Sequence, residues 1–293
     1  MRRIALSSFA AVLALLGLVS CAAVPAQQNV KLVVAATDNF RPVLAQLAQD
    51  YCFRQPWVSI ELHTATTATL EKDFKDGAAF DVYIPARPDS MMALANSDAI
   101  NPRSIVFPLP HNELVLVAPP ESDLRVLYGD YTPLASASVR QIAVVNPDLL
   151  LGYLTREAFI SLKLIAPTGD LDQPLVGTGG PAGSAPGAPP SLLPSLATVS
   201  SLASKLLYLN TEADVLAAVK DGRAQVGIVF HTSALTDKKV RLLTRLPDGS
   251  YEPIIYSAAI PRNAPHNDEA WHFLDYLRSA EALATMQRNG LSQ

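Results

Sequence analysis

Small hydroxyl, amide and alanine residues stand where apolar segments that resemble strands give way to segments that resemble helices. They are Asn39, Thr66, Thr67, Ala86 and Thr211. A helix N-terminus carries unpaired N–H groups and a partial positive charge, so several of them meeting at one cleft can bind an anion without Lys or Arg. Asn and Thr also cap helices throughout proteins, so a purely structural cap is the competing interpretation for each of these residues taken alone.

The sequence motifs of most enzymes are absent. The chain has no HExxH, CxxC, GxSxG or GxxxxGK[ST] pattern, and its five histidines show no close metal-ligand spacing. Gly177-Thr178-Gly179 begins like a dinucleotide fingerprint, but Pro181 stands where the helix should open. A hydrolase that uses His231 or His111 beside a carboxylate is an alternative without local support. We therefore expect a binding protein that is not an enzyme and uses neither a cofactor nor a metal.

Short apolar strands alternate with helical patterns along most of the chain. Strands are predicted at 31–36, 58–63, 81–84, 114–118, 141–145, 225–230 and 254–260. Helices are predicted at 42–51, 70–77, 89–95, 152–162, 211–221, 268–277 and 280–288. This alternation is typical of parallel sheets with helices on their faces, so the predicted fold class is α/β.

Composition excludes several classes of protein. The chain has 293 residues, of which 49% are hydrophobic, and this fraction is too high for intrinsic disorder over most of its length. A formal net charge of -4, with no block of Lys or Arg, argues against a nucleic-acid partner. Two cysteines cannot build a zinc ribbon or a disulfide framework, and Cys52 is expected to be a buried structural thiol.

The first 26 residues have the pattern of an export leader. Arg2 and Arg3 precede an apolar run over 5–19, which is too short to span a membrane as a helix. Leu18-Val19-Ser20-Cys21 resembles a bacterial lipobox, in which the cysteine is acylated, so Cys21 is the predicted lipidation site. Val24-Pro25-Ala26 offers an ordinary signal-peptidase site instead. In both cases we expect a periplasmic or cell-envelope protein, whose only membrane contact would be a lipid anchor.

The segment from Pro167 to about Leu202 differs from the rest of the chain. Its central residues, 174–194, are rich in Pro, Gly, Ser and Ala and carry no charge. Such a composition cannot bury enough side-chain surface to order itself, so we expect a flexible inserted loop.

Several strings resemble those of periplasmic molybdate-binding proteins of bacterial ABC importers. They are VVAATDNFRPVLAQLAQDY, TATTATLEKDFKDGAAFDVYIPA, LVLVAP and NTEADVLAAVKDGRAQVGIVF. Their order and spacing match that family from about Lys31 to Leu291, and GAAFDVYIPA is the most specific piece. The resemblance implies a monomeric two-domain clamshell, whose first lobe comprises 27–118 plus 250–293 and whose second lobe comprises 119–249. It also implies a hinge formed by the strands 114–118 and 254–260.

The same resemblance implies a ligand and its contacts. The ligand would be a tetrahedral oxyanion, molybdate or tungstate, held by neutral donors, and the partner would be an ABC permease in the inner membrane. Carried over residue by residue, the binding positions are Asn39, Thr67, Ala86, Glu212 and Phe230. This chain departs from the family at Phe230, which has no hydroxyl group, and at Arg87, which places a cation beside the site. The alternative is a binding lipoprotein of the same fold that takes a different anion or a small organic ligand, or that has no transport role.

Overall fold

The computed structural model describes residues 29–166 and 202–293, so the leader with Cys21 and most of the predicted inserted loop lie outside the described residues. In the first lobe, β1 (Val30–Thr37) lies between β2 (Val58–Ala65) and β3 (Val82–Ile84) in a parallel sheet. Successive side chains of a strand face opposite sides of its sheet. Accordingly, Leu32 and Val34 pack in the same core as α1 (Arg41–Arg54), whereas Ala35 packs with residues of α2 (Thr67–Lys75) and α3 (Pro88–Asn96).

The second lobe is built on a five-stranded mixed sheet. Its strand order is β7 (Leu206–Leu209), β6 (Ile142–Val145), β8 (Val226–Phe230), β5 (Leu114–Ala118) and β9 (Arg241–Arg245). β7, β6 and β8 are parallel, whereas β5 runs antiparallel to both of its neighbours. Its helices are α4 (Leu150–Ser161), α6 (Glu212–Lys220) and α7 (His231–Thr236). The predicted α/β class with mainly parallel sheets and flanking helices is confirmed.

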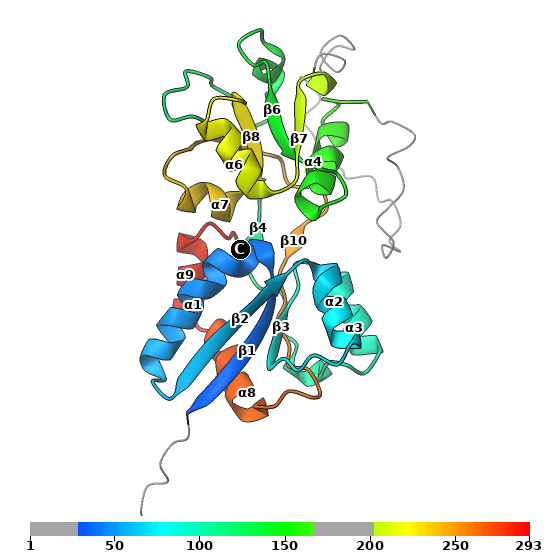
Figure 1. The fold of residues 1–293 in the computed structure, drawn as a ribbon, viewed down its shortest axis with the longest axis vertical. Coiled ribbons are helices and arrows are strands. Elements are labelled where there is room, and N and C mark those ends of the chain that lie inside the picture. The colour runs from blue at the N-terminus through cyan, green and yellow to red at the C-terminus, as the bar shows by residue number, and fades with distance from the viewer. Residues whose placement is uncertain (1–28, 167–201) are drawn as a thin grey trace, which may run out of the picture.

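Two short strands connect the lobes. β4 (His111–Asn112) pairs in antiparallel fashion with β10 (Ile254–Ile255), and Figure 1 shows both between the two sheets. We call β4 and β10 the hinge strands. The sequence placed 114–118 at the end of the first lobe and in the hinge, but all five residues of β5 lie inside the second sheet, so that boundary is at least five residues too late. The predicted strand 254–260 is continuous only over Ile254–Ile255 and continues as isolated bridges from Ala258 and Ala259.

The chain returns to the first lobe for its last two helices. α8 (Asn267–Leu277) contacts β1, and α9 (Ala280–Arg288) contacts α1. Both match the predicted ranges to within a residue. Within the described residues, the structure adds four strands and α-helices that the sequence did not predict, namely β4, β7, β9 and α7. None of the helices in the described residues is long and apolar enough to cross a membrane.

Two glycines let helices of the second lobe approach its sheet closely. A Cβ on Gly152 would lie 2.1 Å from the backbone oxygen of Asn146, because the first turn of α4 folds back over the end of β6. A Cβ on Gly227 in β8 would lie 2.8 Å from a methyl group of Val219 in α6. Both contacts fix helices whose N-termini lie at the ends of strands that face the first lobe.

Candidate functional site

Three of the predicted binding positions lie at one edge of the first sheet. Thr37 is level with Ala65 across β1 and β2, and Ala36 is level with Ile84 across β1 and β3. The loops that follow these strand ends carry Asn39, Thr67 and Ala86. Parallel strands end at the same edge of a sheet, and ligands of open α/β sheets bind at that edge. Figure 1 shows this edge directed toward the second lobe.

Polar side chains without partners gather at this edge. Both amide atoms of Asn39, the Thr37 hydroxyl and the Ser257 hydroxyl are buried without a hydrogen bond. Ser257 lies beside the end of β3, where its backbone N–H is 3.5 Å from the oxygen of Pro85. A buried polar group without a partner costs about 1–3 kcal/mol, so native proteins seldom keep several together. Neutral amide and hydroxyl groups of this kind can donate to an anion.

Thr67 and Ala86 have different surroundings at this edge. Thr66, not Thr67, caps α2, since its hydroxyl accepts the Thr69 N–H at 3.2 Å. Thr67 is the half-buried first residue of the helix, so its hydroxyl is not used in that cap. Ala86 is fully buried in a crevice that it shares with Leu150 and Leu154 of α4. The two lobes therefore meet closely beside Ala86.

Two charged residues, Asp38 and Arg87, lie at this edge. The Arg87 guanidinium donates to Glu252 at 2.8 Å and lies 3.8 Å from Asp89, so its charge is compensated within the protein. Burial raises the pKa of Glu252, and Arg87 opposes this shift. Asp38 is exposed to solvent. Arg87 therefore supplies no uncompensated cation to the cleft.

The second lobe presents the start of α6. Thr211 caps this helix, because its hydroxyl accepts the Asp214 N–H at 3.1 Å. Glu212, the next residue, turns its carboxylate onto the end of β8, where it accepts the Phe230 N–H at 2.7 Å and the Ser233 hydroxyl. Burial raises the pKa of Glu212 to about 7. The two predicted positions of the second lobe, Glu212 and Phe230, are thus joined directly, and Phe230 is buried.

Tyr256 connects the two halves of this region. Its ring lies 4.5 Å from the ring of Phe40, the residue after Asn39. Its hydroxyl accepts from Asn112, and the negative charge of Glu212 lies close enough to raise the pKa of Tyr256 further. Asn39 therefore precedes a residue that contacts Tyr256, and Glu212 lies close enough to Tyr256 to affect its pKa. We define the interlobe site as Thr37, Asn39, Thr67, Ala86, Ser257, Glu212 and Phe230.

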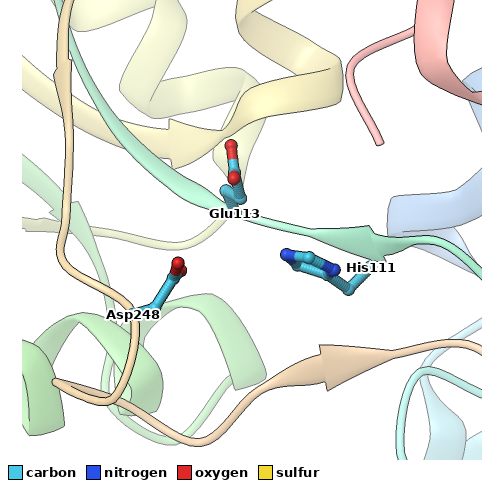
Figure 2. A group of neighbouring side chains, drawn as sticks. All are labelled: His111, Glu113 and Asp248. Carbon is cyan, nitrogen blue, oxygen red and sulfur yellow. The ribbon is translucent and has the colours of Figure 1, made fainter. Parts of the chain in front are cut away.

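A second group of ionisable residues surrounds the crossing from β4 to β5. Figure 2 shows His111, Glu113 and Asp248, whose potential ligand atoms all lie within 4.8 Å of one another. Glu113 already accepts from Arg245 at 2.8 Å and from Ser292 at 3.0 Å. The guanidinium compensates the carboxylate, so this donor set is poorly suited to a divalent cation.

The structure brings histidines to a carboxylate, as the hydrolase alternative requires. His231 Nδ1 lies 3.4 Å from Glu113, which also belongs to the group around His111. However, the nearby hydroxyl of Ser292 donates to the carboxylate, so the order of serine, histidine and acid is not formed. This cluster joins the chain crossing to α7 and to the C-terminal segment, and we interpret it as structural.

An open pocket lies elsewhere on the first lobe. It has a volume of about 440 Å³ and lies between the C-terminal end of α1 and α8. Tyr51, Trp57 and Tyr276 line it together with His272. It is at the amino end of β2, opposite the edge that carries Asn39, so it is not part of the interlobe site.

Comparison with known proteins identifies the family. Residues 32–292 match the model of the family described as bacterial extracellular solute-binding protein. The chain belongs to this family, whose members bind solutes and are not enzymes. It is 23% identical over 267 residues to the putative ABC transporter substrate-binding lipoprotein YvgL of Bacillus subtilis, covering 91% of this chain and 88% of the relative.

Two further relatives are described as molybdenum or molybdate proteins. The molybdate-binding protein ModA of Haemophilus influenzae is 25% identical over 268 residues, with 90% of this chain and 91% of the relative covered. The substrate-binding domain of a putative molybdenum ABC transporter from Clostridium difficile superposes with a TM-score of 0.69 at 19% identity, covering 90% of this chain and 99% of that one. These matches confirm the family resemblance and the two-lobe fold, and the ligand contacts of Asn39, Thr67, Ala86, Glu212 and Phe230 stay predictions.

Sequence reasoning missed three contributors to the interlobe site. Thr37 directly precedes Asp38-Asn39, so its place at the end of β1 could have been inferred from the predicted strand. Ser257 carries no local signal, because the irregular segment after β10 brings it to β3 from 172 positions away along the chain (257 - 85). The carboxylate of Glu212 was also not foreseen as a contact of Phe230.

Proposed function

We propose that this protein is the extracytoplasmic receptor of an ABC importer and that it binds a small tetrahedral oxyanion, molybdate or tungstate, in the interlobe site. The observation that carries the proposal is the set of buried, unpaired neutral groups at the strand ends, from Thr37, Asn39 and Ser257. Family membership and the molybdate and molybdenum relatives support the same class of ligand.

The donor chemistry suits a dianion that is held without a counter-charge. A tetrahedral oxyanion accepts many hydrogen bonds, and hydroxyls, amides and backbone N–H groups together can satisfy it. Arg87, the cation beside Ala86, is already paired with Glu252. Since molybdate and sulfate carry equal charge, selection between them would rest on the size of the site.

Binding would be coupled to movement of the lobes about the hinge strands. The two lobes are joined by β4 and β10, and α1 contacts α7 across the boundary between them. Enclosing the anion between the lobes would stabilise a closed form that the permease can distinguish from the open one. We also propose an envelope location, with Cys21 as a lipid anchor.

Titration calorimetry and a thermal-shift series with molybdate, tungstate, sulfate and phosphate test the ligand. We expect molybdate and tungstate to raise Tm and sulfate to have little effect. Asn39→Ala and Ser257→Ala should reduce the shift, whereas Asn101→Ala, which removes an amide that caps the 3-10 turn at Pro102–Ser104, should not. No response to any of the four oxyanions would refute this function.

The leucines at the start of α4 favour a second candidate. Leu150 and Leu154 form an apolar wall against Ala86, and such a wall suits a small organic anion better than an inorganic one. This candidate is a binding lipoprotein of the same fold with an organic ligand. A thermal-shift screen of small carboxylates and organic phosphates would distinguish it, since inorganic oxyanions would then give no shift.

Metabolic labelling with a fatty acid tests the anchor. The wild-type protein should incorporate label and fractionate with membranes, and Cys21→Ala should do neither. Release of unlabelled wild-type protein into the soluble envelope fraction would instead indicate cleavage near Ala26.

A further inference from the structure

Glu212 places an ionisable side chain in the interlobe site. It is the first residue of α6, and the proposed function uses its backbone N–H as a donor to the anion. Its carboxylate turns to the end of β8, where it accepts the Phe230 N–H at 2.7 Å and the hydroxyl of Ser233. Tyr256, which contacts the residue after Asn39, lies close enough to interact with the charge of Glu212.

The charged groups of the neighbouring elements have partners other than Glu212. On α7, His231 faces Glu113 at 3.4 Å. On α1, Arg41 donates to Thr64 at 2.8 Å, and on α6 itself Asp214 accepts from the hydroxyl of Thr211 at 2.8 Å.

The remaining neighbours do not supply a cation either. Beside Ala86, Arg87 is paired with Glu252. From the segment after β10, Tyr256 is the titratable neighbour, and it stays neutral because burial raises its pKa well above the usual range. Within the described residues, no Lys or Arg forms an ion pair with Glu212. The carboxyl group is therefore desolvated without a cationic partner, and this desolvation raises its pKa to about 7 against the opposing hydrogen bonds from Phe230 and Ser233.

The protonation state of this group decides what it can offer to an oxyanion. An ionised carboxylate has acceptors only, so its negatively charged oxygens would repel those of the oxyanion. A neutral carboxyl group has one O–H to donate, while the two lone pairs of its other oxygen can still accept from the N–H of Phe230 and the hydroxyl of Ser233. Molybdate has no proton to donate near neutral pH, so only the second arrangement forms a hydrogen bond.

We infer that Glu212 is a specificity-determining residue that contacts the oxyanion in its neutral form, so that binding of molybdate takes up one proton. This inference rests on the proposed function. The proton comes from solvent and is held between Glu212 and the ligand, and no covalent bond changes. An ionised Glu212 would repel a dianion, so binding would weaken at high pH and the ligand-free protein would be favoured.

Calorimetry with molybdate at pH 6, 7 and 8, in two buffers of different ionisation enthalpy, tests the inference on the wild-type protein. If the neutral form alone binds, Kd should rise about tenfold from pH 6 to pH 8, because ionisation begins to compete near pH 7. The buffer dependence of the heat at pH 8 should correspond to uptake of nearly one proton per bound molybdate.

Two variants separate Glu212 from other charges. Glu212→Gln, which carries an amide N–H in place of the carboxyl O–H, should lose both the pH dependence and the proton uptake. Asp214→Asn is the matched control on the same helix turn, and it should keep both. Glu212→Ala gives a second test if the glutamine variant folds poorly, because it should likewise show no proton uptake.

The outcomes distinguish this inference from the proposed function. Molybdate binding with constant Kd and no proton uptake from pH 6 to pH 8, or pH dependence that persists in Glu212→Gln, would overturn the role of Glu212 and leave the proposed function standing. Absence of binding to any oxyanion would overturn both.

Discussion

The side-chain amide of Asn112 donates to the Thr232 hydroxyl at 3.0 Å and to the Tyr256 hydroxyl at 3.2 Å. Asn112 belongs to the hinge strand β4, whereas Thr232 belongs to α7 of the second lobe. All three residues are almost completely buried. This amide therefore connects the hinge, the second lobe and the tyrosine beside Glu212 within one hydrogen-bond group.

Replacing this amide should destabilise the protein. Asn112→Ala leaves two buried hydroxyls with one partner fewer, and we expect a loss of about 1–3 kcal/mol in the free energy of unfolding. Urea denaturation measures it. Asn289→Ala is the control, because Asn289 donates to Thr285 at the half-buried end of α9. Equal losses in the two variants would show that Asn112 has no special role in joining the lobes.

Asn39 should affect binding and stability in opposite directions. Its buried amide has no partner in the protein, so Asn39→Ala should leave the free energy of unfolding unchanged or raise it by up to about 1 kcal/mol. The same change removes donors from the ligand, and together with Thr67→Val it should weaken oxyanion binding by about 2–4 kcal/mol in total. Denaturation without ligand and calorimetry with molybdate check the two halves. Unchanged affinity in both variants would place the site elsewhere.

Glu212 should make stability depend on pH even without ligand. Its pKa rises from 4.5 to about 7 on folding, so the folded protein binds more protons than the unfolded chain between these values. Stability from this group is then present below about pH 4.5 and is lost as the pH rises through 7. Glu212→Gln should therefore exceed the wild type by about 2–3 kcal/mol at pH 8 and match it near pH 4. Denaturation at both pH values measures the difference, and a constant difference would contradict the assignment.

Gly152 should not tolerate a side chain. An added Cβ would lie 2.1 Å from the Asn146 oxygen and 2.4 Å from the Val145 oxygen, both of which belong to the backbone. We expect Gly152→Ala to cost about 3 kcal/mol or more, since the start of α4 must move away from β6. Ser161→Ala at the exposed end of the same helix is the control. Thermal unfolding of the two variants tests this, and a small effect at Gly152 would mean that α4 shifts freely.

Local apolar patterns predicted the elements that form the cores of the two lobes. β1, α1 and β8 have continuous or periodic apolar residues, and their observed bounds lie close to the predicted ones. The apolar run of β5 identified a strand but could not indicate its sheet, because that depends on which distant strand pairs with it. β9 escaped prediction because arginines at both ends interrupt its short apolar run. α7 has only six residues, too few to show a helical period.

The interlobe site likewise has parts that the sequence could predict and parts that it could not. The common edge of Asn39, Thr67 and Ala86 follows from the order of strands and helices, since parallel strands end together. The contact between Glu212 and Phe230 depends on side-chain direction at two strand ends. Ser257 reaches the site only because the chain returns from the second lobe. Arg87 is a cation by sequence, but its pairing with Glu252 becomes visible only in three dimensions.

The pairing of His111 with Ser292 determines when the hinge can be completed. Each residue donates its backbone N–H to the oxygen of the other, at 2.7 and 2.9 Å, and Ser292 also donates to Glu113. The partners are 181 positions apart (292 - 111), so a ribosome must have made the whole second lobe, α8 and α9 before they can meet. During synthesis each lobe can begin to collapse on its own, and β4 can pair with β10 before Ser292 is made, but the pairing of Ser292 with β4 forms last. A chain stopped a few residues early would have both sheets and the β4–β10 pair, but it would lack the bonds that tie the C-terminal segment to His111 and Glu113.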